Sequence, residues 1–242
     1  MIFLHGRDST AIELASELFE SQDSGGRTLL KSFPSLRWVF PTAGVRHAVR
    51  FGCEISQWFD MWSVENPGER TELQAAGLRE SVESTIDLIQ QETRNVPAER
   101  ILLAGISQGC AVAIHSLLGT DHPLAGFIGL CGWLPFGDDI EMINTSGLAP
   151  TERLGQVRAL VKSSPPSTAA TPTQASLNTP IFLSHSRNDE MAPVQNRERL
   201  GIRLSMLGMS VEWHCYVEGG HWLNEPQGVE DMVAFINRYL GD

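Results

Sequence analysis

The clearest chemical signal in the sequence is the pentapeptide Gly105-Ile106-Ser107-Gln108-Gly109. It follows an apolar run that is typical of a buried strand, and it precedes a segment with the apolar spacing of a helix. In that setting the two glycines allow a sharp turn that lifts the serine hydroxyl above the end of a sheet. The motif therefore predicts a nucleophile at Ser107, and the alternative is a turn of small residues without chemistry.

A serine hydroxyl becomes a nucleophile at neutral pH only when a neutral imidazole takes its proton and a carboxylate holds that imidazole in the right tautomer. In this strand-turn-helix arrangement the acid and then the histidine follow the serine along the chain. Asp189 comes after the apolar run 180–185, and His221 comes after the run 211–217. We therefore expect Ser107, Asp189 and His221 to meet at one edge of a sheet.

Each assignment has rivals. Glu190 is adjacent to Asp189 and is the alternative acid. His185 ends a strand just before the acid and is expected to support it by hydrogen bonding. The other histidines are expected to be mostly structural, for example His214, which lies inside a predicted strand and cannot reach the tip of its neighbour. The full set of competing histidines is His5, His47, His115, His122, His185 and His214.

The oxyanion that forms during acyl transfer needs two backbone N–H donors. In this arrangement one donor is the residue after the nucleophile, here Gln108, and the other comes from a loop after an earlier strand. The opening strand turns at His5-Gly6-Arg7, where the glycine lets the backbone approach closely. We therefore expect the second donor to be the N–H of Arg7, which is identified by its position alone.

The elements that must position these residues follow from hydrophobic periodicity. Apolar runs rich in β-branched and aromatic residues predict strands at Met1–His5, Leu36–Pro41, Arg100–Gly105, Gly126–Cys131, Pro180–His185 and Val211–Val217. Segments of helical period between them predict helices at Ser9–Ser21, Leu73–Glu92, Gln108–Leu118, Val194–Leu207 and Val229–Tyr239. Alternating strands and helices predict an α/β fold with a largely parallel sheet, helices on both faces and ligands at the carboxyl ends of the strands.

Residues 136–179 interrupt this alternation, because such a connection usually takes only about 2–6 residues. The part from Ser163 to Thr179 is mostly Ser, Pro, Thr and Ala without charge, a composition that forms no core of its own. One interpretation is a surface loop. The other is a lid over the site with Glu152–Val161 as a short helix. We expect one domain, residues 1–242, that carries 136–179 as an insertion.

Composition excludes several function classes. The chain has 18 basic and 29 acidic residues and a formal net charge of −11, which disfavours nucleic acid as a partner. Neither Lys31 nor Lys162 ends an apolar strand, so Schiff-base and Ser-Lys chemistry are disfavoured. The cysteines lack C-x-x-C spacing, which predicts a reduced, cytoplasmic chain without structural zinc. No signal-peptide pattern and no apolar run of ~18 residues is present, so no transmembrane segment is expected.

Clustered aromatic and apolar residues near the predicted nucleophile could line an acyl or aryl pocket. Candidate substrate-binding residues are Trp58, Met61, Trp62, Trp133 and Leu134. The alternative is that they pack their loops onto the core, since Trp is highly buried on average. Asp60, which lies among them, is expected to be structural because the acid role is already filled.

A local positive run lies at Arg46, His47 and Arg50 in this acidic chain. Together with Arg7 it could bind a carboxylate or phosphate of the substrate. A solvated loop is the commoner explanation of such a run.

Seven sites along the chain carry a family resemblance. They are Phe-Leu-His-Gly at 3–6, Phe-Pro-Thr-Ala at 40–43, Trp-Phe-Asp at 58–60, the pentapeptide at 105–109, Gly-Trp-Leu-Pro at 132–135, Asp189 four residues after His185, and His221. In this order they resemble the acyl-protein thioesterase and carboxylesterase group of the α/β-hydrolase fold, including its divergent fungal members. The resemblance covers nearly the whole chain except residues 136–179.

The resemblance implies hydrolysis of an ester or thioester through Ser107, Asp189 and His221, with the oxyanion held by the N–H groups of Arg7 and Gln108. It implies an acylated small molecule, lipid or protein as substrate, and it requires no metal or organic cofactor. Alternative functions are a hydrolase or acyl transferase dedicated to small-molecule biosynthesis, and a non-catalytic binding protein on a hydrolase scaffold.

The sequence also departs from the family pattern. Arg7-Asp8-Ser9 stands where the family usually has Leu-Gly-Asp, and His185-Ser186 stands in place of His-Gly. Ala192-Pro193 replaces Val-Pro after the acid. The first strand begins at Met1, so we expect a sheet that is shortened at its N-terminal side.

Overall fold

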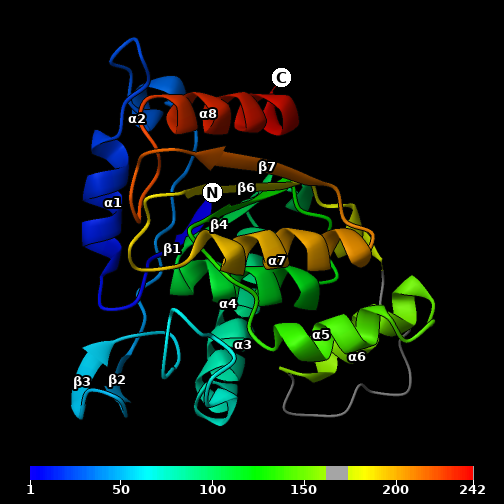
Figure 1. The fold of residues 1–242 in the computed structure, drawn as a ribbon. Coiled ribbons are helices and arrows are strands. Elements are labelled where there is room, and N and C mark those ends of the chain that lie inside the picture. The colour runs from blue at the N-terminus through cyan, green and yellow to red at the C-terminus, as the bar shows by residue number, and fades with distance from the viewer. Residues whose placement is uncertain (162–173, 242) are drawn as a thin grey trace.

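A sheet of five parallel strands forms the centre of the molecule (Figure 1). The computed structural model describes residues 1–161 and 174–241. The strands lie in the order β1-β4-β5-β6-β7 and span β1 (Ile2–Leu4), β4 (Leu102–Ile106), β5 (Gly126–Leu130), β6 (Ile181–Ser186) and β7 (Val211–Tyr216). Each neighbouring pair is parallel. The predicted α/β class with a largely parallel sheet is confirmed.

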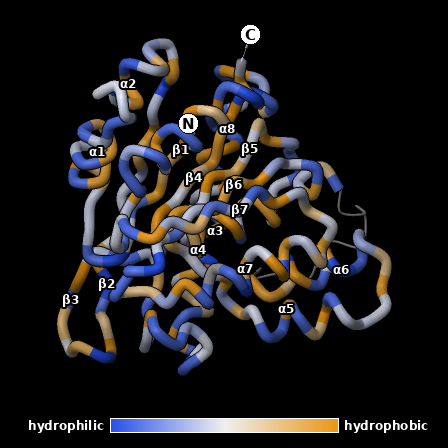
Figure 2. The backbone as a smooth tube through the Cα atoms, turned by 45° about the horizontal axis from the view of Figure 1, so that its top comes forward, coloured by the Kyte–Doolittle hydropathy of each residue, from blue (hydrophilic) through white to orange (hydrophobic). Residues whose placement is uncertain are grey.

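Helices cover both faces of this sheet (Figures 1 and 2). On one face lie α3 (Ala75–Glu92), α4 (Gln108–Gly119) and α7 (Val194–Met206), and on the other lie α1 (Ala11–Glu20) and α8 (Gln227–Leu240). Successive residues of a strand point to opposite faces. Leu103 therefore packs into the cluster with α4, whereas Leu102 packs into the cluster with α8. This double burial explains why the strands read as continuous apolar runs.

The strand predicted at Leu36–Pro41 is wrong. In that segment only Val39 forms a bridge, to Ile2 of β1. Val39 N donates to Met1 O at 2.8 Å, and Phe3 N donates to Val39 O at 2.9 Å. The apolar character serves side-chain packing instead: the rings of Trp38 and Phe40 lie 5.2 and 5.6 Å from Phe19 of α1.

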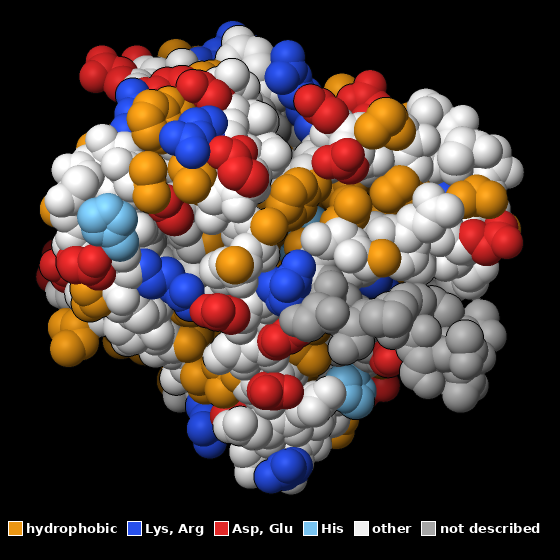
Figure 3. Space-filling view, turned by 90° about the horizontal axis from the view of Figure 1, so that it is seen from below, with side chains coloured by type: hydrophobic (Ala, Val, Ile, Leu, Met, Phe, Trp, Pro, Cys, Tyr) orange, Lys and Arg blue, Asp and Glu red, His pale blue; other side chains and the backbone are white. Residues whose placement is uncertain are grey.

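A two-stranded antiparallel hairpin was not predicted from the sequence. It consists of β2 (Val45–Ala48) and β3 (Cys53–Ser56) and is largely exposed. Its residues lack the apolar runs that identify the central strands. Asp8 N donates to Ser56 O at 2.7 Å, which ties the hairpin to the turn after β1. Figure 3 shows basic and acidic side chains close together on this side of the molecule.

Short helices complete the fold. They are α2 (Leu29–Ser32), α5 (Gly137–Asn144), α6 (Pro150–Ala159), η1 (Thr71–Leu73), η2 (Ala98–Arg100) and η3 (Ala175–Asn178). The helix expected at Glu152–Val161 is α6, which begins two residues earlier, whereas α5 was not predicted.

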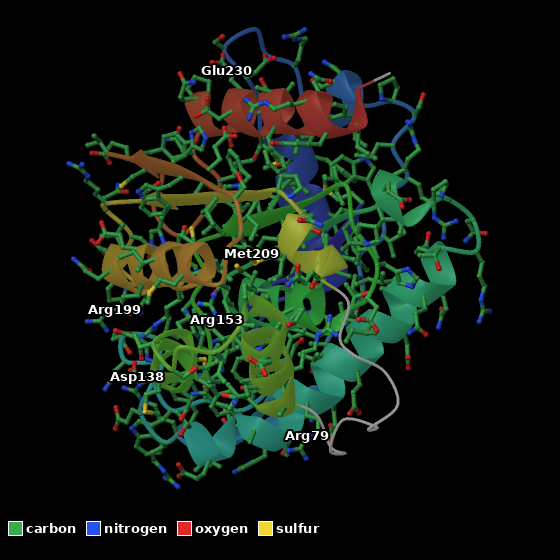
Figure 4. All side chains as sticks on the ribbon, turned by 90° about the vertical axis from the view of Figure 1, so that its right-hand side faces the viewer. Arg79, Asp138, Arg153, Arg199, Met209 and Glu230 are labelled. Carbon is green, nitrogen blue, oxygen red and sulfur yellow. The ribbon has the colours of Figure 1, made fainter. Side chains whose placement is uncertain are left out.

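The described parts of the segment 136–179 pack against the core. Asn144 of α5 donates from Nδ2 to Arg203 O of α7 at 3.0 Å, and Arg158 of α6 donates from Nε to Leu118 O of α4 at 2.6 Å. Leu154 of α6 is completely buried. Figure 4 shows this layer, with Asp138, Arg153 and Arg199 labelled on α5, α6 and α7. Most of the stretch rich in Ser, Pro and Thr, residues 163–173, lies outside the described residues.

Two further features bear on the sequence predictions. Within residues 1–161 and 174–241, no helix combines the length and the apolar character that crossing a membrane demands. No disulfide joins Cys53, Cys110, Cys131 and Cys215, all of which lie in the described residues, and Cys110 and Cys131 are buried.

Candidate active site

Ser107 occupies the sharp turn between β4 and α4. Its backbone lies at φ 54° and ψ −123°, a strained conformation for a residue with a side chain. The turn closes only with glycine on both sides. A Cβ at Gly105 would lie 2.5 Å from the main-chain carbon of Gly109, and a Cβ at Gly109 would overlap the carbonyl oxygen of Leu4. The structure thus forms the strained turn that the pentapeptide predicts.

The two predicted oxyanion donors belong to Gln108, which follows Ser107, and to the loop in which Gly6 approaches Ser107. Gly6 packs against the serine, since a Cβ on Gly6 would lie 4.0 Å from Ser107 Oγ. Gln108 is the first residue of α4, whose positive end favours negative charge. In the described part of the chain, neither the N–H of Arg7 nor that of Gln108 donates to another backbone group. Both donors are therefore available to a substrate oxygen.

Asp189 and His221 come together at the carboxyl ends of β6 and β7. Asp189 Oδ2 lies 2.7 Å from His221 Nδ1. A carboxylate only accepts, so Nδ1 carries the proton and Nε2 remains free to accept one. The loops are also linked to each other, because Gly220 N donates to Asn188 Oδ1 at 2.9 Å. The side chain of Asp189 is fully buried, and that of His221 is 16% exposed.

Within the described residues, no hydrogen bond joins Ser107 Oγ to His221. Catalytic hydrogen bonds are often long in enzymes without substrate and tighten in the Michaelis complex. The structure thus joins Asp189 and His221 by a hydrogen bond, and Ser107 follows β4 at the carboxyl end of the same sheet.

Asp189 is held as a carboxylate by four hydrogen bonds. Burial alone raises the pKa of this group, but donors outweigh that effect and hold the pKa well below its usual range. His185 Nε2 and His221 Nδ1 lie 2.9 and 2.7 Å from Oδ2, and the N–H groups of Met191 and Ala192 donate to Oδ1 at 2.9 Å each. The rival acid Glu190 is exposed. The contacts therefore favour Asp189 as the acid.

The rival histidines have structural partners. Burial lowers the pKa of His115 to about 4, and its Nε2 lies 3.1 Å from Pro135 O. His214 lies between Glu212 and Asp231 at 2.9 and 3.0 Å. His5 accepts at Nε2 from Ala43 N, and its Nδ1 lies 2.7 Å from Gly6 O. His185 contacts the predicted acid Asp189, and His5 belongs to the predicted oxyanion loop.

The side chain of Gln108 makes two hydrogen bonds that were not predicted from the sequence. Its Oε1 accepts from Trp58 N and its Nε2 donates to Phe59 O, both at 2.8 Å. Trp58 Nε1 in turn donates to His5 O at 2.8 Å. The residue after Ser107 therefore fixes the loop at Trp58, which in turn bonds to the turn after β1. No local signal identifies this contact, because it joins residues about fifty positions apart.

The predicted substrate-binding residues are mostly buried. Trp58 and Met61 belong to the core cluster and are 5% and 0% exposed, which favours their packing role. Trp62 is partly exposed. Trp133 and Leu134 are also buried in the core, but they line a cavity of about 210 Å³ together with residues 66–68 and 136–139 and with Asn196, Arg199 and Arg203 of α7.

The basic run is largely neutralised. Arg46 pairs with Glu80 at 2.8 Å and His47 with Glu54 at 3.3 Å. Arg50 lies 3.8 Å from Glu65 and donates to Trp62 O. The Arg7 side chain is 11% exposed and lies 3.6 Å from Asp60. These pairs favour the solvated-loop interpretation and give Asp60 the structural role that was expected.

One group of side chains has the donor types of a metal site. The donor atoms of Cys131, His185 and Asp189 lie within 4.8 Å of one another. Both oxygens of Asp189 already accept hydrogen bonds from the acid loop and from the two histidines. A metal ion bound there would have to displace the contacts that orient the acid.

A strained serine after a central strand, followed by an acid and a histidine at two later strand ends of one parallel sheet, defines the class of α/β-hydrolases. The sequence model of the phospholipase/carboxylesterase family matches residues 1–146. The chain belongs to that family of hydrolases.

Curated relatives agree with this assignment, and a solved structure shares the fold. Acyl-protein thioesterase 1 of Yarrowia lipolytica is 32% identical over 241 residues, covering 98% of this chain and 88% of the relative. Acyl-protein thioesterase 1 of Cryptococcus neoformans is 31% identical over 116 residues, so the match spans 47% of this chain and 49% of that relative's length. The crystal structure of Arabidopsis thaliana SOBER1 superposes with a TM-score of 0.73 at 22% identity, covering 99% and 97% of the two chains, and shows the shared fold.

Proposed function

We propose that this protein is a serine hydrolase that cleaves carboxylic ester or thioester bonds of acylated substrates through Ser107, Asp189 and His221. The observation that carries the proposal is the hydrogen bond of 2.7 Å between the buried Asp189 side chain and His221, at the same sheet edge as the strained Ser107. This bond holds His221 in the tautomer whose Nε2 can accept a proton.

In the proposed mechanism, His221 Nε2 takes the proton of Ser107 Oγ as that oxygen attacks the acyl carbonyl carbon. The carbonyl oxygen becomes an oxyanion, and the N–H groups of Arg7 and Gln108 donate to it. The tetrahedral intermediate collapses, and His221 gives its proton to the departing alkoxide or thiolate. Water then attacks the acyl-enzyme with His221 again as base, which releases the acid and restores the serine.

The relatives named acyl-protein thioesterase support an acylated protein or lipid as substrate, and an acylated small molecule fits the same chemistry. Trp133 and Leu134, which line the 210 Å³ cavity, are the proposed substrate contacts, together with the partly exposed Trp62. We also propose that the protein works in the reducing cytoplasm, where its four cysteines would remain without disulfides. We also propose that residues 1–242 act as one domain, because α5 and α6 bond directly to α7 and α4.

A fluorophosphonate probe tests the proposal, because it modifies only a serine that a neighbouring base activates. We expect labelling of the native protein and its loss in Ser107→Ala. Ser116→Ala is the matched control: Ser116 lies on α4 as well, is fully buried and donates to Val112 O at 2.9 Å. Labelling of Ser107→Ala at the native rate would refute the proposal and favour a non-catalytic binding protein.

A panel of acyl esters and thioesters then separates the enzymatic alternatives. Turnover of fatty acyl thioesters supports the thioesterase assignment. Turnover of a single aromatic ester with no activity on fatty acyl chains would instead indicate an enzyme dedicated to one small-molecule pathway.

A further inference from the structure

We propose that His185 is a positioning residue that orients Asp189 and sets the pH range in which His221 acts as a base. This inference rests on the proposed function, and it concerns a buried histidine that takes no direct part in the reaction. His185 lies at the carboxyl end of β6, four residues before Asp189.

The geometry places both histidines on one carboxylate oxygen. His185 Nε2 lies 2.9 Å from Asp189 Oδ2, the oxygen that is also 2.7 Å from His221 Nδ1. The side chains of His185 and Asp189 are both fully buried. Hydrogen bonds to a charged acceptor in such a place are among the strong ones. His185 therefore contributes directly to the direction in which the carboxylate points.

The tautomer of His185 follows from its neighbours. Its Nε2 also lies 2.9 Å from Ala192 O. A carboxylate and a backbone carbonyl only accept, so Nε2 carries the proton. Nδ1 is buried and has no hydrogen-bond partner in the described part of the chain. A second proton at Nδ1 would be an unsatisfied buried donor, which is costly, so His185 donates from Nε2 as a neutral ring.

The same contact holds the loop on both sides of the acid. Through Nε2, His185 approaches Asp189 and Ala192, while Ala192 N donates to Asp189 Oδ1. Residues 185, 189 and 192 thus form a closed set of hydrogen bonds. If His185 loses its donor, Asp189 Oδ2 keeps only its hydrogen bond to His221, so the carboxylate and the His221 ring that it orients are held less firmly.

Because both histidines bond to the same oxygen of Asp189, removing the His185 donor should change the pH–rate profile of the enzyme. The titratable groups around Asp189 are His185 on β6, His221 after β7 and the buried Cys131 after β5, whereas Glu190 is exposed and Glu218 bonds to Asn188. When His185 stops donating, more negative charge on Oδ2 faces the His221 imidazolium and stabilises it. His221 then gives up its proton only at higher pH, so the acid limb of the pH–rate profile moves upward.

The experiment compares His185→Leu with His185→Gln, whose amide nitrogen restores a donor near the Nε2 position. We expect His185→Leu to lower kcat/KM about tenfold, the usual effect of one lost hydrogen bond to a charged group, and to raise the acid-limb midpoint measurably. His185→Gln should recover most of both. The matched control is His115→Leu, since His115 is equally buried and its Nε2 also lies near a backbone carbonyl, but it does not contact Asp189.

An unshifted acid limb in His185→Leu would overturn the inference, as would a shift of equal size in His115→Leu. If His185→Leu does not fold, NMR of the imidazole nitrogens in the native protein decides: a proton on His185 Nε2 supports the inference, and a proton on Nδ1 overturns it. Failure of the proposed function is distinguishable, because it appears as absent fluorophosphonate labelling of the native protein, whereas the NMR result needs no turnover.

Discussion

Replacing Asp189 by asparagine tests the acid–base half of the site most directly. Asp189 accepts four hydrogen bonds, two at each oxygen. The asparagine oxygen can keep only one of these pairs. If it stays with the backbone N–H groups of Met191 and Ala192, its NH₂ group faces two ring nitrogens that donate in the native protein.

The consequence for catalysis follows from the tautomer of His221. Opposite an NH₂ donor, Nδ1 must become the acceptor, so the proton moves to Nε2. A protonated Nε2 cannot take the proton of Ser107. The loss expected for the wrong tautomer of a serine triad is about 10⁴-fold in kcat, which corresponds to about 5.4 kcal/mol in the activation free energy.

The assay measures initial rates with an activated aryl ester for Asp189→Asn and for the adjacent variant Glu190→Gln. Glu190 is exposed, so Glu190→Gln should retain native kcat/KM. Circular dichroism establishes that both variants are folded. A folded Asp189→Asn protein that retains more than about a tenth of the native rate would refute the tautomer argument, since one lost hydrogen bond alone accounts for that much.

Three further predictions concern the scaffold. Gly109→Ala should prevent folding or lower Tm sharply, because the new Cβ overlaps Leu4 O. Gly44→Ala, whose Cβ meets no atom within 4 Å, should leave Tm nearly unchanged, and equal melting curves of the two variants would contradict this prediction. Gln108→Leu loses two buried hydrogen bonds to Trp58 and Phe59 and should cost about 2–4 kcal/mol in urea unfolding, and a cost under about 0.5 kcal/mol would show that they contribute nothing net. Burial lowers the pKa of His115 from 6.5 to about 4, so between these pH values the unfolded chain binds a proton that the folded chain does not. The free energy of unfolding should therefore fall by up to about 3 kcal/mol as the pH drops from 6.5 to 4, and His115→Leu should reduce this pH dependence.

Much of the fold could be predicted because its signals are local. The apolar runs at 100–105, 126–131, 180–185 and 211–217 correspond to β4, β5, β6 and β7 to within two residues at each end. β4, β5 and β6 are buried along their whole length, so nearly every one of their residues reports on its environment, whereas β7 lies at the edge of the sheet and is only partly buried. The hairpin β2–β3 is exposed, and its polar residues carry no such signal.

The wrong prediction of a strand at 36–41 also arose from an apolar run that reports burial. A run of apolar residues indicates burial, but it does not show whether the burial is by sheet pairing or by side-chain packing. Trp38 and Phe40 are placed by the ring of Phe19, and only Val39 pairs with β1. Residues that are apolar because they pack against Phe19 thus gave the same sequence pattern as a buried strand.

The sequence by itself determined the strained turn at Ser107 and the strand ends that carry Asp189 and His221, because glycine geometry and hydrophobic periodicity act over a few neighbouring residues. Only the tertiary structure decided that His185 shares an oxygen of Asp189 with His221 and that the Gln108 amide fixes the loop at Trp58. Such hydrogen bonds depend on distances between segments far apart in the chain, which the packing of the whole sheet sets.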